Sequence, residues 1–443
     1  MQLSKNKKYQ YLFFSILSIY IIFNGGNTNL FIQLNFILIS LFFLFCLKDK
    51  NYNLHLKNFY YSNKKSIFLY TIFLSYLFFQ ILPLPINLLK FFSPEKYKFI
   101  LMISDSSYSS ISLSPSNSFF QIFHFFTLLL MVFILKMIFY TERHKYRFYF
   151  FLSIFGFFAS IIAVLFYLNG NPDFFIFKNS YYKNASSGFF INRTVLAIFL
   201  LFCLISSLEL LKNFEFYKKQ KKDQFFIKIY IRLFVLFITI GIITTFSRIG
   251  NFLLLITILI YFLNELFFSK NKNQSFKIII LFIILFDLLF VGIYFGTSEI
   301  IDRFSFLREE FSYIPLEIIS ISRFDIIKFA FSELINFILF RYGSGSFESL
   351  FKLKFMNSSS QFANHAHSDL IEFFGEFGLV GITLIILSFI KFILSKKNYT
   401  LINVIVFSYS IIILSFDFSL HIPIIQILFL SFLLLNKKTT QLN

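Results

Sequence analysis

The stretch NHAHSDLIEFFGEFGLVGITLIILSFIKFIL, residues 364–394, joins a cluster of ionisable side chains to an apolar helix long enough to cross a bilayer. Two histidines and three acidic residues lie near its start: His365, His367, Asp369, Glu372 and Glu376. The acidic residues follow one another at steps of three and four, so they share one face of a helix. Because charged groups beside hydrocarbon are costly in free energy, we expect this cluster to serve a function.

The composition extends this conclusion to the whole chain. Its 443 residues are 57% hydrophobic and 14% charged, so most of its length cannot face water. We therefore predict an all-α polytopic membrane protein, a single integral membrane domain over residues 1–443 with about 12 transmembrane helices. The apolar runs lie near 11–23, 29–47, 66–83, 119–138, 148–168, 189–211, 225–245, 249–268, 278–296, 370–394, 400–418 and 424–435.

The basic residues predict the orientation. When the loops are assigned alternately to two sides, one side carries 25 Lys and Arg residues and the other carries 14. Positively charged loops stay in the cytoplasm. Both termini are therefore predicted to be cytoplasmic, and the segments 84–118, 169–188 and 297–368 are predicted to face outward, into the periplasm of a Gram-negative cell.

The arginines depart from this rule. Six of the nine fall on or near the outer face, whereas only eight of the 32 lysines do. Guanidinium groups present planar pairs of donors that match phosphate oxygens. The outer face therefore favours an anionic ligand, and the net charge of +19, mainly the cytoplasmic excess, does not indicate nucleic-acid binding. The six are Arg193, Arg248, Arg303, Arg308, Arg323 and Arg341.

Two outer segments carry a structural pattern. Prolines block a continuous helix over the outer interfacial segment 84–118, so short pieces are expected there. In the large periplasmic loop 297–368, polar and apolar residues alternate at helical spacing from about Ser322 to Phe340, which predicts an amphipathic helix along the membrane surface. The glycine-containing stretch 343–346 could be a phosphate loop, but an ordinary turn is the better interpretation.

His367 is the strongest candidate for chemistry. A neutral imidazole can accept a hydroxyl proton, and Asp369 or Glu372 could orient it or stabilise its cation. His365 is a second candidate, and the alternative for both histidines is a neutral polar role in a wet loop. A metal site from His365, His367 and Asp369 is disfavoured, because the spacing is short and no cysteine or further histidine joins it. We expect neither a metal nor another cofactor.

Arg193 and Arg248 stand at the edges of predicted spans. Placing an arginine in the apolar slab costs on the order of 2.5 to 3.5 kcal/mol, so an anionic partner is expected at each. The alternative is that these side chains extend to lipid headgroups. Arg323, at the start of the amphipathic helix, could supply a third guanidinium.

Three further ionisable residues are not assigned a catalytic or binding role. Asp287 and Glu265 lie within or near apolar spans and could relay protons in a transporter, but each stands alone, which favours hydrogen bonding between helices. His421, in an outer turn, has no acidic neighbour in the sequence beyond Asp417.

Several of these residues form an ordered set of motifs. The main string is His367-Ser-x-x-Ile371-x4-Glu376-x-Gly378-Leu-x-Gly381. The others are QILPLP at 80–85, GFFINR at 188–193, Ser247-Arg248, Arg323 and GSGSF at 343–347. The set resembles the O-antigen ligase and polymerase superfamily of bacterial envelope glycan enzymes, whose signature is His-Asn-x-x-Leu and Glu-x-Gly-x-x-Gly. The likeness covers about residues 75–390, and Ser368, Ile371 and Thr194 replace its usual Asn, Leu and Asn.

The resemblance implies an enzyme that takes a glycan from undecaprenyl diphosphate and passes it to an acceptor hydroxyl, without a nucleotide sugar or an essential metal. Arginines can hold the leaving diphosphate and stabilise its developing charge, while a histidine removes the acceptor proton. We therefore assign catalytic roles to His367, Arg248 and Arg193. Substrate-binding roles go to Arg323, His365, Glu376 and Asp369.

We predict a multi-pass glycosyltransferase of the bacterial inner membrane, of the O-antigen ligase type, which uses the lipid A core as acceptor in lipopolysaccharide biosynthesis. The alternative is an O-antigen or exopolysaccharide polymerase, whose acceptor is a second lipid-linked glycan. A secondary transporter or flippase of an anionic substrate is less favoured, because transporters place ionisable groups near the midplane of the membrane. The predicted partners are the lipid-linked donor, the acceptor and the bilayer, and nucleic acid is not among them.

Overall fold

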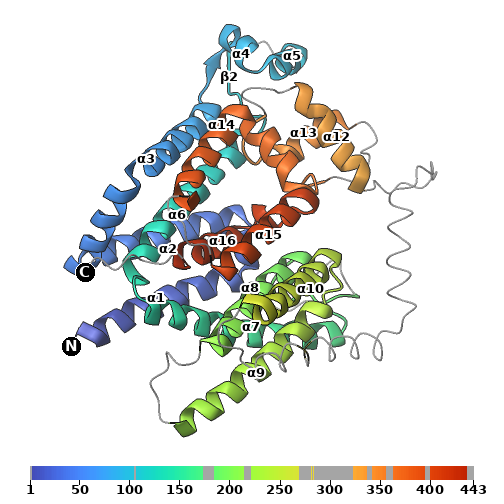
Figure 1. Cartoon of the computed structure of the whole chain (residues 1–443). Helices are drawn as coiled ribbons and strands as arrows, with labels where there is room; N and C mark the ends of the chain where they lie inside the picture. The colour runs from blue at the N-terminus through green and yellow to red at the C-terminus, as the bar shows by residue number, and fades with distance from the viewer. Residues whose placement is uncertain are drawn as a thin grey trace.

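The computed structural model describes residues 2–103, 106–172, 184–213, 221–268, 323–336, 342–355, 363–394 and 400–436, together with 281 and 283. These parts of the chain are almost entirely helical (Figure 1). A two-residue antiparallel ladder pairs Leu84 with Ser109 and Pro85 with Tyr108. The helices are α1 Gln2–Ile22, α2 Asn29–Leu47, α3 Lys50–Ile81, α4 Ile86–Phe92, α5 Pro94–Ile103, α6 Pro115–Ile138, α7 Glu142–Leu168, α8 Arg193–Lys212, α9 Lys221–Ile243, α10 Arg248–Leu263, α12 Arg323–Asn336, α13 Phe347–Lys354, α14 Asp369–Leu394, α15 Leu401–Phe416 and α16 Pro423–Leu435. The short turns and strands are η1 Asn24–Gly26, β1 Leu84–Pro85, β2 Tyr108–Ser109, η3 Asn264–Phe268 and η4 Ser419–His421.

The chain is an all-α polytopic membrane protein. Eleven of the twelve predicted spans coincide with a helix, and the run 278–296 falls outside the described residues apart from two positions. Of the described helices, seven are long and apolar enough to cross a membrane, so the count of twelve spans stays a prediction. The seven segments are Asn29–Leu47, Pro115–Ile138, Glu142–Leu168, Arg193–Lys212, Phe226–Ile243, Arg248–Phe267 and Asp369–Ile390.

The remaining predicted spans differ from these seven for identifiable reasons. α3 has a kink at Asn63, and Lys64 and Lys65 follow it, so the apolar part of this helix begins only at Ser66. α15 and α16 are apolar throughout but have only 16 and 13 residues. At 1.5 Å per residue they measure about 24 and 20 Å, less than a hydrocarbon core of about 30 Å.

Side-chain caps fix where several helices begin. At the start of α7, the Thr141 hydroxyl accepts a hydrogen bond from the His144 amide. At the start of α8, the Asn192 side chain accepts one from the Thr194 amide at 2.7 Å. At the start of α10, the Ser247 hydroxyl accepts one from the Gly250 amide at 3.1 Å. Such a cap satisfies an amide that has no partner within the helix. The caps of α8 and α10 make Arg193 and Arg248 the first helical residues.

Two groups of helices form the bundle (Figure 1). In the first group, α3 packs on α6 and α14, and α6 also packs on α2. In the second group, α7, α8 and α9 contact one another, and α10 packs on α8. α16 contacts both α6 and α8 and so connects the groups. The apolar segment of α8 is entirely buried inside the protein. In the other six candidate spans, at most 56% of the apolar segment is buried. α8 is therefore the axis of the second group.

Small residues allow the helices around α8 to approach closely. A Cβ added at Gly156 of α7 would collide with Cys203 of α8, and one at Gly241 of α9 would collide with Ser160 of α7. Because lipid supplies no hydrophobic drive between helices, such close packing is a main source of helix association in a bilayer.

The two segments that are predicted to face outward fold largely as their patterns predict. The proline-containing segment forms two short helices, α4 and α5, and its interfacial position stays a prediction. The amphipathic helix expected from Ser322 to Phe340 forms α12 over Arg323–Asn336, and 337–340 fall outside the described residues. α12 packs on α14, and Tyr342, Phe347 and Phe351 belong to a small apolar core between these outer helices.

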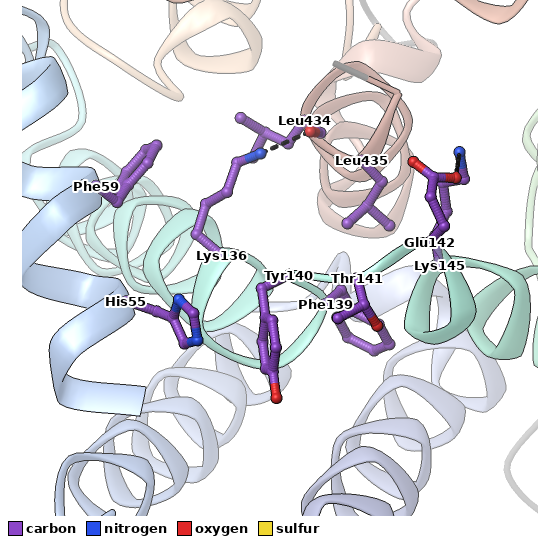
Figure 2. A pocket seen from close by; sticks show the side chains of 10 residues that line it. All are labelled: His55, Phe59, Lys136, Phe139, Tyr140, Thr141, Glu142, Lys145, Leu434 and Leu435. Atoms are coloured by element: carbon purple, nitrogen blue, oxygen red, sulfur yellow. Dashed lines mark hydrogen bonds and ion pairs between the residues drawn. The ribbon is translucent and has the colours of Figure 1, made fainter. Parts of the chain in front are cut away.

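At one end of the bundle, which we call the basic end, the start of α1, the α6–α7 turn and the end of α16 meet. Arg147 donates to Gln10 at 2.9 Å, and Lys136 donates to the Leu434 carbonyl at 2.7 Å. A cavity of about 250 Å³ lies here, and Figure 2 shows the side chains that line it, among them His55, Lys136 and Lys145. The two ends of the described chain therefore lie together, as the predicted topology requires; the side of the membrane stays a prediction.

Candidate functional site

Three carboxylates line one face at the start of α14. Asp369, Glu372 and Glu376 are 0%, 1% and 2% exposed, although Asp and Glu are rarely fully buried without a partner. The first two lie in the first helical turn, where the positive end of the helix dipole favours negative charge. The helix dipole alone does not satisfy three buried carboxyl groups, so other segments must supply partners.

His421 is the main partner, and it comes from η4, 52 residues after Asp369. Its Nδ1 bonds to an Asp369 oxygen, and its Nε2 lies 3.4 Å from Glu372 Oε1 and 3.8 Å from Glu376 Oε2. Its ring stacks on Phe373 with centroids 4.2 Å apart. Asp417 is the nearest acidic residue to His421 in the sequence, and the expectation that no acidic cluster lies beside His421 is therefore wrong. The contact between His421 and Asp369 could not be predicted, because the two residues are far apart in the sequence and no local pattern around residue 421 indicates it.

The carboxylates determine the charge of His421. Burial alone lowers the pKa of its imidazole, but the carboxylates of Glu372 and Asp369 outweigh burial and raise that pKa well above its usual value. A backbone contact fixes the geometry further, because the Leu420 amide donates to the second Asp369 oxygen at 2.8 Å. The η4 turn is thus attached to the first turn of α14.

His365 joins from the other side. Its Nδ1 lies 2.9 Å from Glu372 Oε1, and the Ala366 amide donates to Glu372 Oε2 at 2.7 Å. The His365 ring stacks on Phe418, and its centroid lies 5.2 Å from that of His421. We call His365, Asp369, Glu372, Glu376 and His421 the histidine–carboxylate cluster.

His367 lies beside the cluster with a different environment. It has a positive φ of 55°, which is uncommon for a residue other than glycine and indicates a backbone held by its surroundings. Burial, assisted by the Arg323 guanidinium, lowers the pKa of His367 to about 4. The imidazole is therefore neutral near pH 7 and able to accept a proton.

The expected partners of His367 are bound elsewhere. Asp369 bonds to His421 and Glu372 bonds to His365, although the Glu372 charge still acts on His367. In the part of the chain that the structure describes, the His367 ring forms no hydrogen bond. Its edge-on contact with Phe418, at 5.4 Å between centroids, leaves its nitrogens available to a ligand.

A break in α14 explains the Glu-x-Gly part of the motif. Gly378 adopts φ 64° and ψ −178°, a conformation that is essentially confined to glycine. Three carbonyl oxygens near the break accept hydrogen bonds from other segments. These bonds are Tyr342 N to Gly375 O at 3.3 Å, Gln80 Nε2 to Glu376 O at 3.1 Å and Tyr76 Oη to Phe377 O at 2.7 Å.

The same contacts explain two other motifs. Gln80 of the QILPLP motif also accepts the Ser344 amide at 3.3 Å, so the motif and the Gly343–Ser346 turn meet at the break in α14. The turn packs on the start of α6, where Ser118 donates to the Ser344 carbonyl at 2.6 Å and Ser112 contacts Ser346 at 3.0 Å. Because the Ser344 backbone and the Ser346 hydroxyl bind protein, the turn is structural, and the phosphate-loop interpretation is not supported.

The arginines begin helices that are close to one another. Ser247, next to Arg248, donates to Thr194, next to Arg193, at 3.1 Å, so the starts of α8 and α10 are adjacent. Both arginines are partly exposed. α8 also contacts η4, which carries His421. Arg323 is exposed, and its charge acts on both His367 and Asp417.

The structure thus describes an all-helical membrane protein with a buried histidine–carboxylate cluster next to a neutral histidine. The O-antigen ligase family model matches residues 233–386, which contain α10, α12, α13 and the first part of α14. This match confirms the resemblance to the O-antigen ligase superfamily and supports a membrane glycosyltransferase of the ligase or polymerase type. Arg193 and His421 lie outside the matched range. No curated protein matches the chain.

Proposed function

We propose that the chain transfers a glycan from undecaprenyl diphosphate to an acceptor hydroxyl at the periplasmic face of the inner membrane, as an O-antigen ligase with the lipid A core as acceptor. The observation that carries the proposal is the neutral His367, whose pKa is lowered by burial and by the Arg323 charge, within the range of the family match. The pair provides a proton acceptor and a cation for an anionic leaving group.

Each residue has a defined part in the transfer. His367 accepts the proton of the acceptor hydroxyl as the new glycosidic bond forms. The bond between the sugar C1 and the diphosphate oxygen breaks, and the leaving group carries away the electron pair. Arg193, Arg248 and Arg323 stabilise the charge that develops on the diphosphate. Asp369, Glu376 and His365 hold the substrate-facing loop and the first turns of α14 in place.

The arrangement argues against a secondary transporter. The carboxylates of the cluster lie in the first two turns of α14, and the break of this helix at Gly378 follows directly. A transporter would need these groups near the middle of the spans, where alternating access moves a substrate past them. A cluster at the end of a span suits chemistry at a membrane surface.

The test is transfer by the purified, reconstituted protein from an undecaprenyl-diphosphate glycan. Parallel reactions contain either lipid A core or a second lipid-linked glycan as acceptor. Glycosylated lipid A core supports the ligase, and elongated lipid-linked glycan with no ligation would identify a polymerase instead. Failure of both acceptors with a well-folded protein would contradict the proposal.

A further inference from the structure

The histidine–carboxylate cluster requires positive charge. Its three carboxylates are at most 2% exposed, and burying an ionised carboxylate is costly unless it is paired. In the described part of the chain, the groups that pair with them are the imidazoles of His365 and His421. Each imidazole can bring one proton, or both can bind a metal ion through a lone pair.

The ligand atoms have the spacing of a metal site. One ligand atom each from His365, Glu372 and His421 lies within 4.8 Å of the other two. Glu372 Oε1 is 2.9 Å from His365 Nδ1 and 3.4 Å from His421 Nε2. Bonds of about 2.0 to 2.2 Å in a tetrahedral zinc site place neighbouring ligand atoms roughly 3.3 Å apart.

The surrounding contacts orient these atoms toward a common point. Asp369 binds Nδ1 of His421, which directs Nε2 into the cluster, and a carboxylate in this position is usual behind a metal-bound histidine. The Ala366 amide occupies Glu372 Oε2, which leaves Oε1 facing the two imidazoles. The Glu376 carboxylate lies 3.8 Å from His421 Nε2, beside the fourth position.

His421 Nε2 provides a second, independent observation. The His421 side chain is only 9% exposed, yet Nε2 is buried and forms no hydrogen bond within the described residues. An unsatisfied buried nitrogen that faces two carboxylates is a place for a cation. A metal was disfavoured from the sequence because no further histidine joined His365, and the fold supplies that histidine.

We propose that His365, Glu372 and His421 bind a divalent transition-metal ion, with Glu376 beside the fourth position. Two imidazole nitrogens and a carboxylate favour Zn²⁺ over Mg²⁺ or Ca²⁺, which prefer all-oxygen sites. The ion is structural: it ties the loop before α14 to α14 and to η4, next to His367. It takes no step in the proposed transfer, and the inference does not depend on that function.

The first test is the zinc content of the purified full-length chain, measured by inductively coupled plasma mass spectrometry. We expect about one ion per chain, and loss of most of it in His365→Ala and His421→Ala. His55→Ala is the matched control, since His55 stacks on Tyr140 at the basic end, and it should keep its zinc. Wild-type protein without zinc, even after incubation with Zn²⁺, would overturn the proposal, as would full zinc content in both cluster variants.

Two further measurements do not depend on drastic variants. Asp369→Asn keeps the shape of the side chain, and it should weaken zinc binding about 10- to 100-fold in competition with a chelator. Wild-type protein loaded with Co²⁺ should show the visible absorption bands of four-coordinate cobalt. Unchanged zinc affinity in Asp369→Asn would show that the ion is not held at this cluster, and the absence of the cobalt bands would show that a proton rather than a metal pairs with the carboxylates; either result would overturn the proposal.

Discussion

Charged side chains have different environments at the two ends of the bundle. At the basic end, the cations are partly exposed at helix ends: Lys145 pairs with Glu142 one turn away, and Lys136 donates to the Leu434 carbonyl of α16. At the start of α14, the acidic residues are buried, and His421, the partner of Asp369, comes from 52 residues further along the chain. The basic end has charges that a topology rule predicts, whereas the cluster has charges that only a specific structure can accommodate.

The comparison also separates shape from chemistry. The cavity of about 250 Å³ in Figure 2 belongs to the basic end, and none of the candidate catalytic residues lines it. A concave surface is the usual first hypothesis for a binding site. Here the buried carboxylates and the family match indicate the other end.

The largest expected effect is on His367. Removing a positioned acid–base group typically costs about 10²- to 10⁴-fold in rate, so His367→Ala should abolish detectable transfer at normal expression. His55→Ala, at the basic end, should transfer normally, and His365→Ala should be milder than His367→Ala. The assay is transfer by reconstituted protein. Wild-type turnover in His367→Ala would make this histidine structural and shift the search for the base to Glu372, Asp369 and Glu348.

The next effect is on the arginines. Arg193→Ala and Arg248→Ala should each reduce transfer by about 10²- to 10³-fold, because each removes a donor to the developing negative charge. Lysine at either position should rescue only in part, since it lacks the planar pair of donors. Lys145→Ala removes a cation at the basic end and should have little effect. Near-normal turnover in both alanine variants would show that these arginines do not stabilise the leaving diphosphate.

A smaller effect is expected on stability. Gly378→Ala places a Cβ in a backbone conformation that favours glycine and should cost about 1 to 3 kcal/mol of folding free energy. The measurement is the thermal unfolding midpoint in detergent, with Thr383→Ala on the exposed side of α14 as control. An unchanged midpoint in Gly378→Ala would show that α14 is not broken at this position.

The last prediction concerns orientation and involves no loss of activity. Single cysteines at exposed Asn364 and exposed Glu142 report on the two ends. Both native cysteines are buried and should stay silent. In intact cells whose outer membrane admits it, an impermeant thiol reagent should label only position 364. Labelling of 142 alone would invert the topology.

The sequence by itself determined the features that depend on short stretches of chain. Apolar runs predicted eleven helices that the structure contains, and prolines predicted the short helices α4 and α5. The string from His367 to Gly381 carried the family resemblance that the match to residues 233–386 confirms. These features follow from local periodicity and turn chemistry, which neighbouring residues define.

Only the tertiary structure decided which partners the ionisable groups have. His421 reaches Asp369 across 52 residues, and Gln80 reaches the Glu376 carbonyl across 296. Neither contact has a local signal, because the free energy of pairing a buried charge depends on which side chains packing brings within a few ångströms. For this reason the motif predicted His367 itself, while the cluster beside it appeared only once α14, α15 and α16 were packed together.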